Sequence, residues 1–163
     1  MDNRKSVIGV IGGGSDVDKS TFDAACETGR LIAERGAVLV CGGLGGVMEA
    51  AAKGAFEAGG TVIGILPSGD KTNANPYVSI AIPTGMGMGR NMLLVQTADV
   101  LIAFPGSYGT LSEIGLALNS GKPVIYLPGV WNLSKAGKVD GNLFKEAFDP
   151  AHAVALALST LAR

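Results

Sequence analysis

Histidine, cysteine, tryptophan and charged residues are all scarce in this chain of 163 residues. It contains one His, two Cys and one Trp, and Asp, Glu, Lys and Arg together make up 17%. So few histidines and cysteines nearly exclude a Cys/His zinc site, and we expect no metal site. The net charge is −1 and there is no basic tract, which argues against nucleic-acid binding.

Long hydrophobic runs are also missing. The N-terminal apolar run VIGVI (7–11) is too short for a signal peptide or a membrane span, so we expect a cytoplasmic protein without a membrane partner. Cys26 and Cys41 lie inside apolar patterns and are expected to be reduced thiols. The low share of charged residues favours a surface that is partly covered in a homodimer or tetramer.

Glycine is in excess, with 25 residues, about twice the share expected from an average usage of roughly 7%. The glycines cluster at the ends of short apolar runs that alternate with helical patterns. The predicted strands are 7–11, 37–41, 61–67, 78–84, 99–104 and 123–127. The predicted helices are 18–34, 46–60, 90–97, 111–119 and 150–162.

This alternation predicts one α/β domain over residues 1–163. The expected architecture is a Rossmann-like, doubly wound, mostly parallel sheet of six or seven strands with helices on both faces. Such sheets bind ligands beyond the carboxyl ends of their strands. Glycine-rich turns follow predicted strands and should converge on one crevice there: 12–14, 42–46, 85–89 and 106–109.

Residues 104–114, FPGSYGTLSEI, link a predicted strand to a helix and allow several interpretations. The segment around Ser107 approaches a nucleophile elbow, but Pro105 replaces its first glycine. His152 follows in the order of a hydrolase triad, yet the chain is short for that fold and His152 has the pattern of a surface helix residue. We therefore disfavour a Ser-His hydrolase.

Two nucleotide motifs are incomplete or absent. The stretch Gly12-x-Gly14-x-x-Val17 lacks the third glycine of the dinucleotide fingerprint, and Cys41-Gly42-Gly43 stands where an acidic residue would end the second strand. No G-K-[ST] sequence occurs anywhere, so a Walker A loop is excluded.

A phosphate cradle at residues 106–110 explains the segment better. A strand-to-helix turn offers free backbone N–H groups and the positive end of a helix dipole, and Thr110 adds a hydroxyl. The alternative is purely structural, because Thr110-x-x-Glu113 also matches a capping box. Arg90 opens a predicted helix, where a cation is mildly unfavourable; this position suggests that Arg90 serves a nearby anion, and the alternative is an ordinary surface arginine. Arg90 and Glu113 could meet around one ligand.

Two longer stretches resemble a known family. CGGLGGVMEAAAKGAFEAGGTVIGILP (41–67) and GRNMLLVQTADVLIAFPGSYGTLSEI (89–114) are similar to the motifs of the LOG-like Rossmann proteins, formerly mislabelled lysine decarboxylases. The resemblance covers about residues 7–127. Characterised members are cytokinin riboside 5′-monophosphate phosphoribohydrolases, which release the base and ribose 5-phosphate.

The resemblance implies roles for individual residues and no required cofactor. The implied catalytic pair is Arg90 and Glu113. The implied phosphate-binding turn consists of Gly106, Ser107, Gly109 and Thr110. The implied glycine-rich lining of the same crevice consists of Gly13, Gly14, Gly42, Gly43 and Gly46.

Several positions depart from the pattern of the hydrolases. Ser107 replaces a glycine, Asn91 a basic residue, and Ser112 the first of two acids. The chain therefore looks closer to the branch that contains molybdenum cofactor carrier proteins, which bind a phosphorylated pterin without known catalysis. We expect a carrier that binds a nucleotide or the molybdenum cofactor, with a nucleoside 5′-monophosphate phosphoribohydrolase as the alternative. The 129–141 loop, which holds Trp131, has no assigned role.

Overall fold

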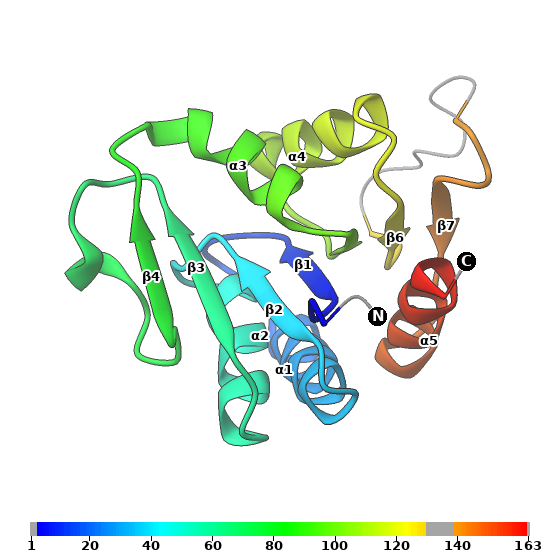
Figure 1. Cartoon of the computed structure of the whole chain (residues 1–163), viewed down its shortest axis with the longest axis horizontal. Coiled ribbons are helices and arrows are strands. Elements are labelled where there is room, and N and C mark those ends of the chain that lie inside the picture. Colours follow the sequence, from blue (N-terminus) through cyan, green and yellow to red (C-terminus); the bar gives the residue numbers. More distant parts are fainter. Residues whose placement is uncertain (1–2, 130–138, 163) are drawn as a thin grey trace.

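Seven parallel strands form one sheet in the order β4-β3-β2-β1-β5-β6-β7 (Figure 1). The computed structural model describes residues 3–129 and 139–162. The strands are β1 (Val7–Ile11), β2 (Val38–Cys41), β3 (Val62–Leu66), β4 (Ile80–Pro83), β5 (Val100–Ala103), β6 (Val124–Tyr126) and β7 (Phe144–Glu146).

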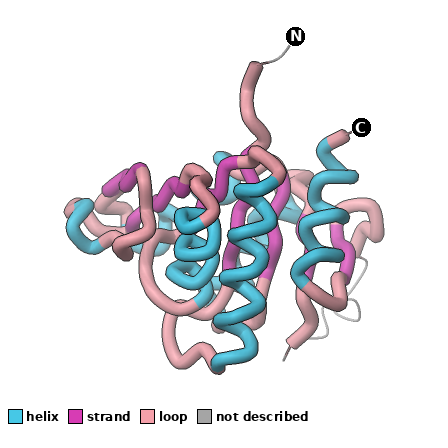
Figure 2. Tube along the Cα trace, turned by 90° about the horizontal axis from the view of Figure 1, so that it is seen from below, coloured by secondary structure: helices cyan, strands magenta, loops and turns pink. Residues whose placement is uncertain are grey.

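Helices cover both faces of the sheet. They are α1 (Lys19–Glu34), α2 (Val47–Glu57), α3 (Arg90–Thr97), α4 (Tyr108–Asn119) and α5 (Pro150–Leu161). In Figure 1, α3 and α4 lie above the sheet, and α1, α2 and α5 lie below it. Figure 2 shows the lower face, where helices lie in front of the strands and the two termini lie on the same side. The predicted doubly wound α/β fold is confirmed.

The central strand is β1, which pairs with both β2 and β5. Ile8 is opposite Leu39 on one side and Val100 on the other, and all three are fully buried. A strand that is buried on both faces needs a continuous apolar run rather than an alternating one, which is why VIGVI forms this strand. The order of the sheet reverses next to β1, and such a switch point opens a crevice at the carboxyl ends of the strands.

Two elements differ from the sequence prediction. Strand β7 (Phe144–Glu146) is a short edge strand in which only Phe144 is buried, so its sequence carries almost no apolar signal. Helix α4 begins at Tyr108, three residues earlier than predicted, because Gly109 and Thr110 belong to its first turn and not to the preceding loop. Most of the 129–141 loop lies outside the described residues.

Helices α1 and α2 cross at the contact of two glycines. A Cβ atom on Gly29 would collide with the carbonyl oxygen of Ala51, and one on Gly54 would collide with that of Cys26. The two backbones therefore touch, and no larger residue fits at either position.

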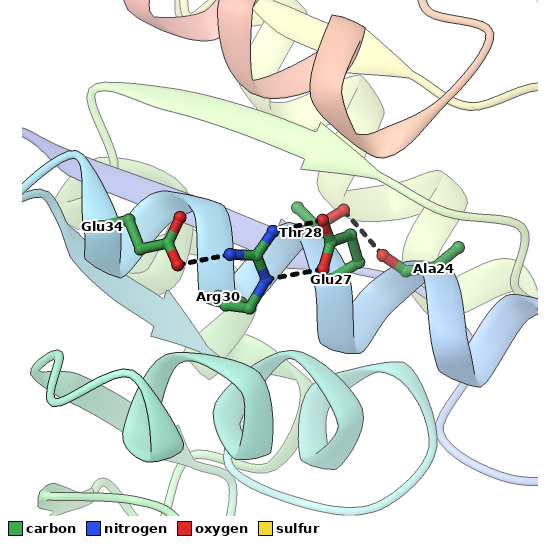
Figure 3. A network of polar contacts seen from close by, with 5 residues as sticks. All are labelled: Ala24, Glu27, Thr28, Arg30 and Glu34. Carbon is green, nitrogen blue, oxygen red and sulfur yellow. Dashed lines mark hydrogen bonds and ion pairs between the residues drawn. The ribbon is translucent and has the colours of Figure 1, made fainter.

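The outer surface of α1 is charged. Arg30 donates from Nε and Nη2 to the carboxylate of Glu27 at 2.7 and 2.6 Å, and it also pairs with Glu34 (Figure 3). Thr28 Oγ1 donates to the carbonyl oxygen of Ala24 at 2.9 Å. Exposed pairs at these spacings each contribute only about 0.2–0.5 kcal/mol. They therefore add little to the stability of the fold.

Candidate functional site

Three loops are tied together at the carboxyl edge of the sheet, on either side of β1. The N–H of Gly13 donates to the carbonyl oxygen of Pro105 at 3.0 Å, and the N–H of Val47 donates to that of Gly13 at 2.8 Å. These bonds join the loops after β1, β2 and β5. The expected convergence of the turns at 12–14, 42–46 and 106–109 is therefore present.

A crevice of about 250 Å³ opens between these loops, the start of α3 and the first turn of α4. Most of the predicted site residues line it: Gly14, Gly42, Arg90, Ser107, Gly109, Thr110 and Glu113. Met48 from α2 and Met88 from the turn before α3 add thioether side chains. The wall of the crevice thus combines polar groups with apolar, adaptable thioether side chains.

The first turn of α4 has no side-chain cap. Ser107 is the N-cap residue and makes no capping hydrogen bond, whereas Asp18 caps α1 and Asp149 caps α5. The interpretation of Thr110-x-x-Glu113 as a capping box is wrong, because the helix begins at Tyr108 and Thr110 already lies inside it. The N–H groups of this turn remain available to an anion.

Thr110 provides a hydroxyl inside the crevice. Its side chain is only 4% exposed, and its Oγ1 makes no hydrogen bond within the described residues. Gly106 makes room for it, because a Cβ atom on Gly106 would collide with Thr110 Oγ1. No fully buried side-chain oxygen or nitrogen among the described residues lacks a hydrogen bond, so the Thr110 hydroxyl is open to the crevice, where a ligand could bond to it.

Arg90 is a buried cation at the start of α3. Its Nη1 donates to the carbonyl oxygens of Gly42, at 2.6 Å, and of Ile65, and its Nε donates to Asn91 Oδ1 at 3.0 Å. A guanidinium has five N–H donors, so three are used and the two on Nη2 have no acceptor among the described residues. The carbonyl ends of β2 and β3 explain how a cation is tolerated at a helix N-terminus.

Glu113 faces the same crevice from the second turn of α4. It is 7% exposed, and burial raises its pKa to about 7, although the guanidinium of Arg90 lowers it in part. Burial in turn lowers the pKa of Arg90, and Glu113 opposes that change. The carboxyl group makes no hydrogen bond within the described chain. Near neutral pH it is therefore divided between an acid that can donate and a carboxylate that can accept.

Asn91 and Ser112, which both differ from the pattern of the hydrolases, contact each other. Asn91 Nδ2 donates to Ser112 Oγ at 3.3 Å, and Ser112 Oγ donates to the carbonyl oxygen of Gly109 at 2.7 Å. Asn91 also lines the crevice, as do Met48 and Met88, and none of these three was predicted as a site residue. The sequence singled out Asn91 as unusual, Met48 lies within one of the two stretches that resemble the family, and Met88 was interpreted as a packing residue.

Comparison with known proteins identifies the family. The sequence model of the SLOG cluster4 family matches residues 5–159. The chain belongs to the SLOG cluster4 family. Its structure is similar to that of the molybdenum cofactor binding protein from Rippkaea orientalis, with a TM-score of 0.92, 40% identity, and coverage of 98% of this chain and 99% of that one. The molybdenum cofactor carrier protein of Chlamydomonas reinhardtii gives a TM-score of 0.89 at 39% identity, with coverage of 98% and 100%.

A curated relative outside this group is an enzyme. The cytokinin riboside 5′-monophosphate phosphoribohydrolase LOG of Oryza sativa subsp. japonica is 35% identical over 96 residues, which are 56% of this chain. The matched region spans only 39% of that protein's length. The resemblance to LOG-like proteins is confirmed, and the solved structures of cofactor carriers match this SLOG cluster4 chain over nearly its whole length.

Four other predicted glycines of this SLOG cluster4 chain have different surroundings. Gly13 and Gly106 line a second pocket of about 300 Å³, which adjoins the crevice at Gly14 and Ser107. Gly43 and Gly46 have positive φ angles of 75° and 64°. A Cβ atom would collide with Leu66 at the first and with the backbone of Gly13 at the second. Gly43 and Gly46 therefore have a packing role. Whether either glycine contacts a ligand stays a prediction.

The nucleophile alternatives gain no support. The ring of His152 stacks on Phe148 with centroids 4.0 Å apart, and His152 is absent from the residues that line the crevice. Burial raises the pKa of the Cys41 thiol to about 11, which makes it a poor nucleophile. Among residues 3–129 and 139–162 there is no group of three His, Cys, Asp or Glu that could hold a metal, and no helix in those ranges could span a membrane.

Proposed function

We propose that this protein binds the phosphate group of a nucleotide or of the molybdenum cofactor in the crevice and acts as a carrier of that ligand. The observation that carries the proposal is the convergence of unused donors. The uncapped turn of α4, the Thr110 hydroxyl and the two Nη2 hydrogens of Arg90 all belong to one crevice. An anion with several acceptor oxygens would satisfy all of them.

The rest of the crevice suits a planar organic group better than a bare ion. Met48 and Met88 line it beside the polar residues, and thioether side chains pack well against rings. A phosphorylated nucleotide or pterin has both parts, a phosphate for the turn and a ring for the methionines. The crevice-lining residues include no Cys or His, so the protein would hold such a cofactor by its organic part.

The lack of hydrogen bonds to the Glu113 carboxyl group favours a carrier function over catalysis. A catalytic carboxylate is normally oriented by hydrogen bonds, whereas Glu113 has none within the described residues. The molybdenum cofactor carrier protein of Chlamydomonas reinhardtii also aligns with this chain over nearly the full length of both proteins. The rice hydrolase, in contrast, is matched over less than half of its length.

The second function is phosphoribohydrolysis of nucleoside 5′-monophosphates, and the presence of Glu113 beside Arg90 favours it. In that reaction water replaces the base at the ribose C1′. Glu113 would stabilise the positive charge that develops on the ribose or orient the water, while the phosphate grip positions the bond.

One experiment separates the two functions. Purified protein is incubated with AMP and related nucleoside monophosphates, and free base is followed by chromatography alongside thermal unfolding. Base release that disappears in Glu113→Gln establishes the hydrolase. Stabilisation by AMP without base release supports the carrier. Neither release nor stabilisation by AMP, inorganic phosphate or isolated molybdenum cofactor would refute the phosphate-binding crevice.

The phosphate grip has its own test. Thr110→Val keeps the shape of the side chain but removes the hydroxyl, and we expect about 10- to 100-fold weaker AMP binding, because hydrogen bonds to charged groups contribute about 1.5–3 kcal/mol. Thr160→Val is the matched control, since Thr160 lies on α5 and its hydroxyl only bonds to Leu156 of the same helix. Equal affinities in both variants would remove Thr110 from the site.

A homodimer or tetramer is also part of the proposal. Large apolar side chains are exposed on β4, in the turn before α3, on α3 and in the first turn of α4: Ile80, Ile82, Met86, Met88, Met92, Leu93 and Tyr108. Between Lys71 and Lys122 the only charged residues are Arg90, Asp99 and Glu113, and two of these are buried in the crevice. An apolar face without charges is typical of a permanent interface.

The oligomer proposal is tested by light scattering. Leu93→Glu adds a charge to the apolar face and should dissociate the assembly. Phe56→Glu changes a comparably exposed apolar residue on α2, on the opposite side of the sheet, and should not. A wild-type protein that is monomeric at all concentrations would contradict the proposal.

A further inference from the structure

A continuous chain of hydrogen bonds runs from Arg90 to the first turn of α4. Arg90 Nε donates to Asn91 Oδ1 at 3.0 Å, Asn91 Nδ2 donates to Ser112 Oγ at 3.3 Å, and Ser112 Oγ donates to the carbonyl oxygen of Gly109 at 2.7 Å. We call these side chains of Asn91 and Ser112 the relay. Asn91 is 4% exposed, so its amide has few other partners to choose from.

The direction of every hydrogen bond in this chain is determined by Arg90, where the chain begins. A guanidinium can only donate, so the amide oxygen of Asn91 must face Arg90 and its NH₂ must face Ser112. The hydroxyl of Ser112 accepts that hydrogen bond, and its own proton is then directed to the carbonyl of Gly109. Each bond polarises the next, which favours one arrangement of the whole chain over its alternatives.

The relay links the two halves of the proposed anion site. On one side the Nη1 bonds to Gly42 and Ile65, together with the Nε bond to Asn91, fix the plane of the guanidinium and orient Nη2. On the other side Gly109 belongs to the uncapped turn of α4. These halves come from different helices, and the relay is the side-chain connection between them in the described structure.

The relay is also neutral. An acidic side chain at either position would pair with the guanidinium and compete with an anionic ligand for its charge. An amide and a hydroxyl hold the guanidinium by hydrogen bonds and leave its charge uncompensated on that side. Glu113 is then the one carboxyl group, among the described residues that line the crevice, that adjusts its charge.

We propose that Asn91 and Ser112 are positioning residues that set the geometry between the Arg90 guanidinium and the anion-binding turn of α4. Neither residue needs to touch the reacting or bound atoms for this role. The expected effect on the affinity for an anion rests on the proposed function. The orientation of the Arg90 guanidinium by Asn91 and Ser112 does not depend on it.

The first test needs no ligand. With ¹⁵N-labelled arginine, the solvent exchange of the Arg90 Nε–H is measured by NMR, and its signal is assigned by its loss in Arg90→Lys. Ser112→Ala should accelerate this exchange about 3- to 10-fold, which corresponds to one net hydrogen bond. Ser112→Thr keeps the hydroxyl and should restore the slow exchange. Ser159→Ala is the matched control, because Ser159 Oγ makes the same bond, to the carbonyl three residues earlier, on α5.

The second test measures affinity for AMP and inorganic phosphate by calorimetry in the same variants. We expect Ser112→Ala to weaken both about 3- to 10-fold, with recovery in Ser112→Thr and no change in Ser159→Ala. Asn91→Asp should weaken both ligands more strongly, since it places a carboxylate on the guanidinium. Thermal unfolding of each variant verifies that it is folded, and exposed Ser112 tolerates alanine in a helix.

The outcomes are distinct. Unchanged Nε–H exchange in Ser112→Ala refutes the relay. Faster exchange with unchanged affinity for AMP and phosphate refutes its positioning role in binding. Faster exchange in a protein whose wild type binds neither probe refutes the proposed function but supports the relay as the device that orients Arg90.

Discussion

The substitution Glu113→Gln should stabilise the protein at pH 8 and leave it nearly unchanged at pH 4.5. Burial raises the pKa of Glu113 from its ordinary value of 4.5 to about 7. Between these pH values the folded chain keeps a proton that the unfolded chain has released. The free energy of unfolding therefore falls as the pH rises through this window, and the loss is complete above pH 7.

The magnitude follows from the size of the shift. Each pKa unit corresponds to about 1.36 kcal/mol, so the wild type should lose about 3 kcal/mol between pH 4.5 and pH 8. Glutamine has the same shape and no charge, and it avoids this loss. For a domain of this length, about 3 kcal/mol corresponds to roughly 6–12 °C in the melting temperature.

The assay is chemical denaturation of both proteins from pH 4.5 to 9 at fixed protein concentration. The difference in unfolding free energy between variant and wild type should grow with pH and level off above about pH 7. Glu146→Gln, at an exposed edge position, is the control and should show no such growth. If the difference in unfolding free energy between Glu113→Gln and wild type stayed constant from pH 4.5 to 9, Glu113 would not be buried as a neutral acid.

Three glycine substitutions test other parts of the structure. Gly106→Ala should weaken AMP binding about tenfold or more in calorimetry, because the added methyl group displaces the hydroxyl of Thr110; unchanged affinity would contradict the described turn. Gly115→Ala, at an exposed α4 position with open space around it, should raise the unfolding free energy by about 0.5–1 kcal/mol in denaturant titrations. Gly54→Ala should lower it by about 1–3 kcal/mol or more, since the methyl group meets the carbonyl oxygen of Cys26; a neutral result would mean that α1 and α2 can separate.

The fold was predictable because its strands are buried on both faces. Continuous apolar runs such as VIGVI are typical of a central parallel strand, and the glycines after them indicated turns. Strand β7 was missed, since an edge strand of three residues with Phe144 as its only buried member has no detectable period. The start of α4 was placed late for a local reason, because Thr110 and Glu113 have the spacing of a cap although neither makes a capping bond.

The candidate site was predictable in its members but not in its contacts. The motifs named Arg90 and Glu113, and the parallel sheet explains why both reach one crevice. Nothing in the sequence indicated that Arg90 bonds to the carbonyl oxygens of Gly42 and Ile65, because backbone acceptors are the same in every residue. The contact between Asn91 and Ser112 was equally hidden, since 21 positions separate them in the chain.

The central position of β1 has a consequence for the synthesis of the chain. Ile8 pairs with Leu39 on one side but with Val100 on the other, so one edge of β1 has no partner until β5 leaves the ribosome. About 60 residues separate these partners, which takes roughly 3–12 s at 5–20 residues per second. For that interval the nascent chain has an unpaired apolar strand edge, and the crevice is incomplete until α4 has followed.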